Sequence, residues 1–390
     1  MSEVQNKVKV KRVLWLTDTF IDHNGVSMVL QAMHREIRER DLPIDILVCS
    51  NDIEPDDHLI VLKPVSEFNI PLYRQQALRI PNYLNIRRIF KRGKYDRVLC
   101  STEGPMGFAA IYLKKLYSVR TDFYMHTDWI MFARQIFGME ELGVKNIQRL
   151  ARIYYNLFDN IFVLNRDQQQ WLTGDSMRFD PSRIFLTAHW VEEVFINSSD
   201  GSRKIKDPQK PPVILFAGRL SREKGIFELP DIFRNARTRV PGLKMLIAGT
   251  GPSENELKKT FPEAEYTGWV NHDRLPEIYH SADLLILPSR FDTFSCVVIE
   301  AFSCGLPVIA YNTKGPKDII QDSVNGFLIN NTEEIVERIV EFFLDEMLQD
   351  SLKMAARERA GDYTPDAILQ GLLKDLGINL SGPFHEAFAN

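Results

Sequence analysis

Short apolar runs that end in small or polar residues recur along the chain and alternate with stretches of helical periodicity. The runs of the first half are VKVKRVLWLTD, IDILVCS, YDRVLCSTEG, RTDFYMHTD and DNIFVLN. Between the first two runs, apolar residues recur at the spacing of one helix face, at Val26, Val29, Leu30 and Met33. Continuous apolar strands that alternate with helices are typical of a parallel sheet covered on both faces.

A polar stretch, NSSDGSRKIKDPQKPP (197–212), interrupts this pattern and has the Gly, Ser and Pro content of a linker. The pattern then restarts with PVILFAG, LKMLIAGTG, AEYTGWV, ADLLILPS, PVIAYN and NGFLI. We therefore predict an α/β protein with two doubly wound, Rossmann-like domains, at 1–196 and 213–390. Ligands of such domains lie beyond the carboxyl ends of the strands, so we expect both sets of ends to face one central cleft. We expect the last helical segment to pack back on the N-terminal domain.

Charge, cysteine content and hydropathy argue against a nucleic-acid-binding, disulfide-bonded or membrane-spanning protein. A formal net charge of −4 gives no reason to expect nucleic acid as a partner. The four cysteines, at 49, 100, 296 and 304, have neither CxxC nor metal-ligand spacing, so we expect reduced thiols. The stretch MSEVQNKVKVKR lacks the apolar core of a signal peptide, and no run approaches the ~20 apolar residues of a membrane span. We expect a cytoplasmic protein.

Two cations stand in the turn GRLSREKG (218–225), directly after the predicted strand PVILFA. The planar fork of Arg219 and the point charge of Lys224 suit a pyrophosphate group at the end of a strand. A second interpretation stays open, in which the loop is solvated and an ion pair to Glu223 neutralises the charge.

The segment LIAGTGPSENEL (246–257) has part of the dinucleotide fingerprint G-x-G-x-x-G. Glu254 occupies the third glycine position, so the fingerprint fails. We interpret most of this segment as a tight turn between a strand and a helix.

The stretch PSRFDTFSCVVIEAFSCG (288–305) places one acid before a helix and one inside it. The helix should begin within residues 293–296, where free backbone N–H groups and the helix dipole form an anion site. Asp292, in the turn before the helix, is either a site residue or the helix N-cap. Glu300, in the second helical turn, can face the same cleft. Its position inside VVIEAF favours a function, because a buried acid is costly unless it is paired or used.

These segments resemble retaining glycosyltransferases of family four, which have the two-domain GT-B fold. In the second half the resemblance is carried by AGRLSREKG, GTGP, YTGWV, ADLLILPS, DTFSCVVIEAFSCGLPVIA and GPKDIIQDSVNGFLI, in the order and spacing of the family. In the first half, TEGPMGFAA, YMHTD and VEEVF resemble the branch that includes lipid-glycosylating mannosyl-, glucosyl- and sulfoquinovosyl-transferases.

The resemblance implies a nucleoside-diphosphate sugar, UDP- or GDP-linked, as the donor of a hexose. It implies a hydroxyl of a lipid or glycan as the acceptor. Arg219 and Lys224 would neutralise the donor diphosphate, and Glu300 would hydrogen-bond the ribose hydroxyls.

The transferred sugar and the phosphates have further implied contacts. Backbone amides at Phe294, Ser295 and Cys296 would meet phosphate or sugar. Asp292 would hold sugar hydroxyls, and His126, at the end of its strand, would reach the sugar near the reacting carbon. Gly25 would let the backbone approach the phosphates at a helix N-terminus.

Three positions depart from the family pattern. Asp292 stands where the family usually has Glu, which implies a different sugar or a damaged site. Asn24-Gly25 replaces a glycine pair, and Trp190 stands where Gly is common; both changes would reshape the acceptor side. Two alternatives therefore stay open: a non-catalytic nucleotide-sugar-binding protein with a decayed site, and a nucleotide-sugar epimerase on the same fold.

No D-x-D metal motif precedes a nucleotide pocket, so we expect no metal and no cofactor apart from the donor substrate. Fixed positive charge would stabilise the departing diphosphate instead.

The stretch NIRRIFKRGKYDR (85–97) is basic, with Arg87, Arg88, Lys91, Arg92, Lys94 and Arg97 around Ile86, Ile89 and Phe90. Such a segment can make a peripheral contact with an anionic membrane, at ~1 kcal/mol per basic residue. A solvated helix that leads into the strand RVLCS is the other interpretation.

Overall fold

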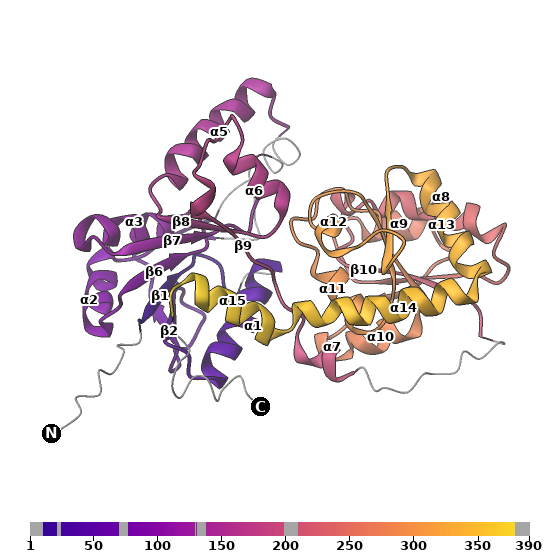
Figure 1. The fold of residues 1–390 in the computed structure, drawn as a ribbon, viewed down its shortest axis with the longest axis horizontal. Coiled ribbons are helices and arrows are strands. Elements are labelled where there is room, and N and C mark those ends of the chain that lie inside the picture. Colours follow the sequence, from indigo (N-terminus) through magenta and orange to yellow (C-terminus); the bar gives the residue numbers. More distant parts are fainter. Residues whose placement is uncertain are drawn as a thin grey trace. The chain divides into compact units, whose positions relative to one another are not determined.

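The computed structural model describes residues 11–21, 25–69, 77–128, 130, 138–198 and 210–378. Contacts divide the chain into two compact units, one of Met1–Thr187 with Leu369–Asn390 and one of Ala188–Ile368. Figure 1 shows that each unit has its own sheet with helices around it. The division falls ahead of the predicted linker at 197–212, of which residues 199–209 lie outside the described part of the chain.

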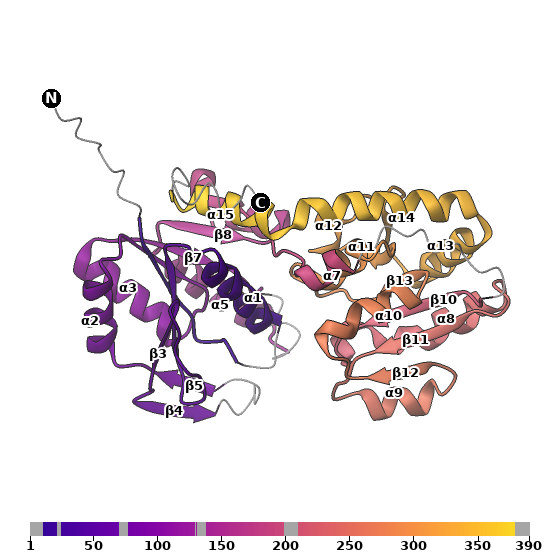
Figure 2. The ribbon, with the colours of Figure 1, turned by 90° about the horizontal axis from the view of Figure 1, so that it is seen from below.

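The first unit contains a seven-stranded sheet in the order β3-β2-β1-β6-β7-β8-β9, and all neighbours are parallel. Its strands are β1 (Val13–Leu16), β2 (Ile44–Cys49), β3 (Leu59–Leu62), β6 (Arg97–Cys100), β7 (Arg120–Tyr124), β8 (Asn160–Val163) and β9 (Ile184–Leu186). An antiparallel pair, β4 (Ser66–Asn69) and β5 (Ala77–Ile80), accompanies it (Figure 2). The five apolar runs of the first half are β1, β2, β6, β7 and β8, as predicted.

Helices cover this sheet because their apolar stripes can be buried against it. They are α1 (Gly25–Glu39), α2 (Tyr83–Gly93), α3 (Pro105–Tyr117), α5 (Glu141–Tyr155), α6 (Arg166–Thr173) and the 3₁₀ turn η1 (Pro181–Arg183). One core cluster joins α2, α3, the end of α5 and α6 to the central strands. Asn82 begins α2 locally, since its side chain accepts hydrogen bonds from the amides of Leu84 and Asn85.

A buried ion pair lies at the centre of the first sheet. Arg97 of β6 donates through Nε to Oδ2 of Asp122 on β7, and through Nη1 to the carbonyl of Leu376. Their side chains are 4% and 0% exposed. Burial raises the pKa of Asp122, although the Arg97 hydrogen bond and charge act in the opposite direction. The pair also connects the last described turn, after α15 (Pro365–Asp375), to the first unit.

The second unit contains a six-stranded parallel sheet in the order β12-β11-β10-β13-β14-β15. Its strands are β10 (Val213–Ala217), β11 (Lys244–Ala248), β12 (Glu265–Gly268), β13 (Leu284–Leu287), β14 (Val308–Tyr311) and β15 (Gly326–Ile329). Every apolar run predicted in the second half forms one of these strands. Figure 2 shows β12, β11 and β10 side by side.

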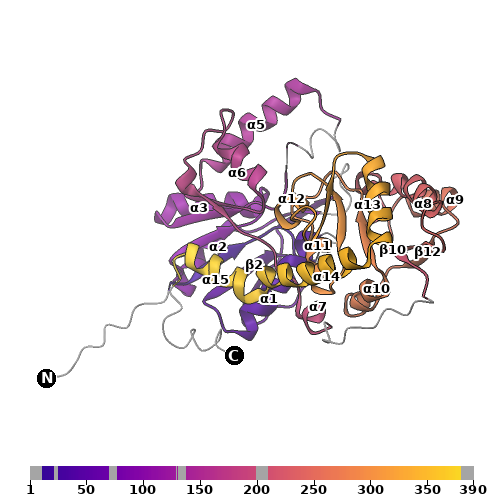
Figure 3. The ribbon, with the colours of Figure 1, turned by 45° about the vertical axis from the view of Figure 1, so that its right-hand side comes forward.

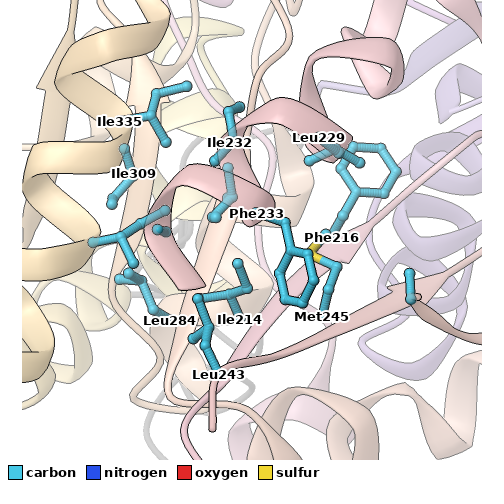
Figure 4. Close-up of a cluster of buried hydrophobic side chains, with 14 of the residues drawn as sticks. Ile214, Phe216, Leu229, Ile232, Phe233, Leu243, Met245, Leu284, Ile309 and Ile335 are labelled. Atoms are coloured by element: carbon cyan, nitrogen blue, oxygen red, sulfur yellow. The ribbon is translucent and has the colours of Figure 1, made fainter. Parts of the chain in front are cut away.

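Helices of the second unit enclose its core. They are α7 (Glu193–Asn197), α8 (Leu229–Arg237), α9 (Glu254–Thr260), α10 (Leu275–Ser281), α11 (Cys296–Ser303), α12 (Pro316–Ile319), α13 (Thr332–Leu344) and α14 (Glu346–Ala360), with 3₁₀ turns η2 (Arg222–Lys224), η3 (Ile226–Glu228), η4 (His272–Arg274) and η5 (Gly361–Tyr363). Figure 4 shows the core where α8 packs on the sheet. There Phe233 of α8 lies among Phe216 and Met245 of the strands, and all three are at most 2% exposed.

Replacing Arg97 by Met would leave Asp122 buried without its charged partner. We expect the first unit to lose about 3–5 kcal/mol of stability. Hydrogen exchange of the β1, β6 and β7 amides in the full chain measures the corresponding opening free energy. The double variant Arg97→Met, Asp122→Leu removes both charges and should recover most of the loss. Full protection in the single variant would contradict this role of the pair.

Candidate functional site

The turn after β10 lies against the loop after β13, because β10 and β13 are neighbours in the sheet. Gly225 has a φ of 69°, and a Cβ atom there would lie 2.0 Å from the carbonyl oxygen of Pro288. Only glycine allows this approach without displacement of the backbone. The approach sets Lys224, the last residue of η2, beside the 288–295 loop. Arg219 lies exposed in the same turn.

Lys224 pairs with Asp292 across the two loops: its Nζ donates to Oδ1 of the carboxylate. Glu223 instead accepts a hydrogen bond from the hydroxyl of Ser221, at 2.6 Å. The ion pair to Glu223 that the sequence left open is therefore wrong for Lys224. The cation and the first acid of the predicted site lie together, although 68 residues separate them in the chain.

Two polar atoms of the 288–295 loop are buried without a hydrogen-bond partner among the described residues. They are Oδ2 of Asp292 and Oγ of Ser295. Asp292 is not the helix N-cap, because Ser295 holds that position, with φ 78° and no side-chain capping bond. Buried polar groups are nearly always satisfied, so these two atoms indicate a place for a ligand.

The helix that follows begins at Cys296, within the predicted range. Its N-terminal side is fixed by packing, because the ring of Phe294 lies edge-on to His189 and Tyr363, with ring centroids 4.9 and 5.9 Å away. Burial raises the pKa of the Cys296 thiol, which is therefore neutral. Gly315 supports the loop from the other side: its φ is 79°, and a Cβ there would lie 2.8 Å from the carbonyl oxygen of Asp292.

Glu300 lies in α11 and accepts a hydrogen bond from the hydroxyl of Tyr279, at 2.7 Å from Oε2. Burial raises the pKa of Glu300, while the Tyr279 hydrogen bond and the charge of His272 act to lower it. His272 in turn lies 2.9 Å through Nε2 from Oε1 of Glu192. This acid thus belongs to a small network of titratable groups, of which Tyr279 is buried and the others are half-buried.

Several residues that support the candidate site were not predicted from the sequence. Glu228 accepts hydrogen bonds from Tyr311 and Thr332 and lies 3.6 Å from the guanidinium of Arg290, which forms a second connection between the two loops. Four more residues were not predicted from the sequence, because each acts through a partner far away in the chain: Tyr279, His272, Glu192 and Gly315. The motif GPKD, already noted for the family, was the one local signal for Gly315.

The GTG turn after β11 has a structural role. A Cβ at Gly249 would lie 2.0 Å from the carbonyl oxygen of Gly218, and a Cβ at Gly251 would lie 2.3 Å from that of Leu220. The glycines therefore allow two turns to pack backbone against backbone, in agreement with the interpretation of the segment as a tight turn.

Gly25 and His126 belong to the first unit. Gly25 is the first residue of α1, and Asn24 lies outside the described residues. His126 follows β7 and is buried, with its ring centroid 4.3 Å from that of Tyr124. Burial lowers the pKa of His126 to about 3, so its imidazole is neutral at physiological pH.

The TEGPMG segment of the first unit is held by Asp18. One carboxylate oxygen of Asp18 accepts a hydrogen bond from the hydroxyl of Thr102, at 2.6 Å, and the other accepts from the amide of Met106, at 3.0 Å. A Cβ at Gly104 would lie 2.6 Å from the same carboxylate. Asp18 thus satisfies an amide at the start of α3.

Within the described ranges, no group of three or more His, Cys, Asp or Glu side chains is arranged to hold a metal ion. The arrangement around Lys224 can neutralise an anion, and the buried oxygens of Asp292 and Ser295 can bind hydroxyls.

Two family models match the chain. The model described as "Glycosyl transferases group 1" matches residues 198–359, and "Glycosyltransferase Family 4" matches residues 23–192. The sulfoquinovosyl transferase SQD2 of Arabidopsis thaliana is 28% identical over 320 residues, which are 76% of this chain and 59% of that protein. A GDP-mannose-dependent alpha-mannosyltransferase of Corynebacterium glutamicum is 30% identical over 209 residues, 52% of this chain and 46% of that protein.

Solved structures share the fold. Sucrose-phosphate synthase from Thermosynechococcus elongatus has a TM-score of 0.74 at 16% identity, over 94% of this chain and 99% of that chain. HepE of Anabaena, in complex with UDP and glucose, has a TM-score of 0.69 at 15% identity, with the same coverage. The chain belongs to the group 1 glycosyltransferases of family four, and its two Rossmann-like units are those of the GT-B fold, as the sequence resemblance predicted.

The His272–Glu192 pair predicts a pH dependence. Burial opposes protonation of His272, but the hydrogen bond and charge of Glu192, with the charge of Glu300, hold its pKa above the ordinary 6.5. A raised folded-state pKa gives stability that is complete below 6.5 and is lost as the pH rises through the folded value. We therefore expect the free energy of unfolding of the second unit to fall as the pH rises above the ordinary value of 6.5.

Urea unfolding across this pH range measures the effect, with His272→Gln as the variant that should flatten it. Glu300 also has a raised pKa, and its contribution to stability starts to fall above the ordinary value of 4.5. The variant Glu300→Gln removes this contribution but also one of the charges that raise the pKa of His272, so His272→Gln is the variant that assigns the slope above pH 6.5. A slope unchanged in His272→Gln would contradict the assignment.

Proposed function

We propose that this protein is a retaining glycosyltransferase that moves a hexose from a UDP- or GDP-linked sugar to a hydroxyl of a lipid or glycan acceptor. One observation carries the proposal. The buried oxygens Oδ2 of Asp292 and Oγ of Ser295, which have no partner among the described residues, lie in the loop that Lys224 contacts. A sugar with hydroxyls beside a diphosphate matches this combination of oxygens and cation.

Lys224 and Arg219 would bind the diphosphate, with the amides at the start of α11 from Phe294, Ser295 and Cys296. Lys224 already pairs with Asp292. In the complex, phosphate would share or replace this pairing, and the carboxylate of Asp292 would turn to the sugar hydroxyls. Positive charge fixed in this way stabilises the negative charge that develops as the diphosphate leaves.

Glu300 would hold the ribose. Its carboxyl is oriented by the hydroxyl of Tyr279, which itself packs against Phe195 with ring centroids 5.8 Å apart. A carboxylate held by a neighbouring hydroxyl needs little reorganisation to accept bonds from vicinal hydroxyls.

The first unit would supply Gly25 near the phosphates and His126 near the reacting carbon. Because its imidazole is neutral, His126 would act as a hydrogen-bonding group toward the sugar, not as a cation. Retention of configuration requires attack on the face from which the diphosphate leaves, and the leaving phosphate would take the acceptor proton. The donor would be the only small molecule required beside the acceptor, with no metal.

The acceptor class rests on relatives named as a sulfoquinovosyl transferase, an alpha-mannosyltransferase and, in Erwinia amylovora, an amylovoran biosynthesis glycosyltransferase. No helix in the described part of the chain has the length and hydropathy to cross a bilayer. We place the protein in the cytoplasm, with a peripheral contact at the inner face of the membrane.

The first prediction from this function concerns Arg219. We expect Arg219→Ala to reduce the transfer rate by about 10²–10³, because one donor to the developing charge is lost. Arg222→Ala is the matched control, since it removes the same charge from the same turn at a side chain that pairs with Glu256, at 2.6 Å. Equal rates in the two variants would remove Arg219 from the diphosphate site.

A second prediction separates the two acids. Glu300→Gln should weaken binding of the free nucleoside diphosphate by ~1.5–3 kcal/mol, because a charge-assisted bond to an unreacting part of the donor is lost. Asp292→Asn should not weaken that binding, since it also frees Lys224 from its carboxylate, and should depress turnover instead. Calorimetric titration with UDP and GDP, beside steady-state transfer rates, measures both.

The outcomes test the role of Asp292 and distinguish a transferase from a binding protein. Equal loss of nucleotide affinity in both variants would show that Asp292 is not a sugar-side residue. Full turnover by Asp292→Asn would reduce it to a loop anchor. Tight binding of the donor by the unaltered protein, with no release of sugar to water or acceptor, would favour a binding protein over a transferase.

A further inference from the structure

Helix α5 presents an unusual surface on the first unit. It runs from Glu141 to Tyr155 and stands out from the sheet in Figures 1 and 3. Val144 and Tyr155 on its inner face are buried, at 2% and 1% exposure. The opposite side carries two parallel stripes at helical spacing, one basic and one apolar.

The basic stripe lines a cavity of about 220 Å³. Its walls are Lys145, Gln148, Arg149 and Arg152 of α5 and Ser176, which follows α6. Within the described ranges, none of these three cations forms an ion pair or a side-chain hydrogen bond. Lys114 of the same unit, in contrast, pairs with Asp159. Three cations, an amide and a hydroxyl around one cavity form a site for a phosphate-bearing anion.

The apolar stripe lies directly beside the cations. It consists of Leu142, Leu150 and Ile153, which are 71%, 66% and 64% exposed. Around Leu150 it continues into a second cavity of about 190 Å³, which is lined by Ile147, Ala151, Tyr154, Tyr155 and one acid, Glu103. The carboxylate of Glu103 accepts a hydrogen bond from the hydroxyl of Tyr155. Large apolar side chains exposed together indicate a contact surface, and cations beside them indicate an anionic partner.

Helix α2, which contains most of the basic segment 85–97, does not expose an apolar stripe of this kind. Its Ile86 and Phe90 are buried in the core of the first unit, at 0% and 6% exposure, so they are not available to enter a bilayer. Arg87 donates to the hydroxyl of Tyr117, at 2.8 Å. Only the exposed charges of residues 85–97 are therefore left for the membrane contact that the sequence predicted there.

We propose that α5 docks this protein on an anionic lipid bilayer. Head-group phosphates enter the cavity between Lys145, Arg149 and Arg152, and Leu142, Leu150 and Ile153 enter the boundary of the acyl chains. The adjacency of the two stripes selects a bilayer over a soluble phosphate, because a soluble ion leaves the apolar stripe in water. This inference is independent of the donor site and does not rest on the proposed transfer reaction.

Co-sedimentation of the full chain with vesicles tests it, using phosphatidylcholine alone and with 30 mol% phosphatidylglycerol. We expect binding only to the anionic vesicles. The triple variant Lys145→Ser, Arg149→Ser, Arg152→Ser should lower the partition coefficient by about 100-fold. The triple variant Leu142→Ser, Leu150→Ser, Ile153→Ser should lower it at least tenfold. All six side chains are exposed or line the open cavity, so both variants should keep the thermal unfolding of the unaltered protein.

Arg88→Ser, Lys91→Ser, Arg92→Ser on α2 is the matched control, because it removes the same charge from another exposed helix surface. Retained binding by this control and lost binding by both α5 variants supports the proposal. Equal loss in the α2 and α5 cation variants would overturn it in favour of a diffuse charge effect. Unchanged binding by the apolar variant, with release from the vesicles by 10 mM inorganic phosphate, would overturn it in favour of a soluble phosphate site. Binding of UDP or GDP, measured in the same variants, should remain unchanged and reports on the donor site separately.

Discussion

The contact between the loops after β10 and β13 is the constraint on which the second unit's site depends. Gly225 touches the backbone of Pro288, and this approach brings Lys224 to Asp292. The side chains of Lys224 and Asp292 are 29% and 10% exposed, so the acid has little access to water as an alternative partner. Arg290 and Glu228 connect the same loops a second time. Lys224, which we propose to bind phosphate, and Asp292, which we propose to bind the sugar, are therefore positioned as one unit.

Asp292 and Glu300 of the 288–305 stretch are stabilised by different kinds of partner, which offset the free-energy cost of removing a carboxylate from water. Asp292 is neutralised by a cation, whereas Glu300 is satisfied by the hydroxyl of Tyr279 and lies near His272. A cation paired with a carboxylate can exchange that partner for a ligand phosphate, whereas a carboxylate held by a hydroxyl keeps its orientation. This difference in environment is the physical basis for assigning the two acids to different parts of the donor.

Amphipathic helices of similar composition have different roles in the first unit. Both α2 and α5 combine basic residues with apolar ones, but Ile86 and Phe90 of α2 complete the core, while one apolar stripe of α5 faces solvent. Periodicity identifies an apolar face and does not tell what covers it. The sheet covers Ile86 and Phe90, and in our proposal a bilayer covers Leu142, Leu150 and Ile153.

The sequence by itself determined the parallel strands, the doubly wound class and a start of α11 within residues 293–296, because apolar periodicity and strand-end chemistry are local properties. It also supplied the candidate site residues of the second unit, through motifs that follow β10 and β13. Only the tertiary structure decided that Lys224 pairs with Asp292 and not with Glu223, and that Tyr279 holds Glu300. It alone showed that Gly249 and Gly315 serve backbone packing. These choices depend on which strands become neighbours, and strand order is set by the packing of the whole sheet, not by any single segment.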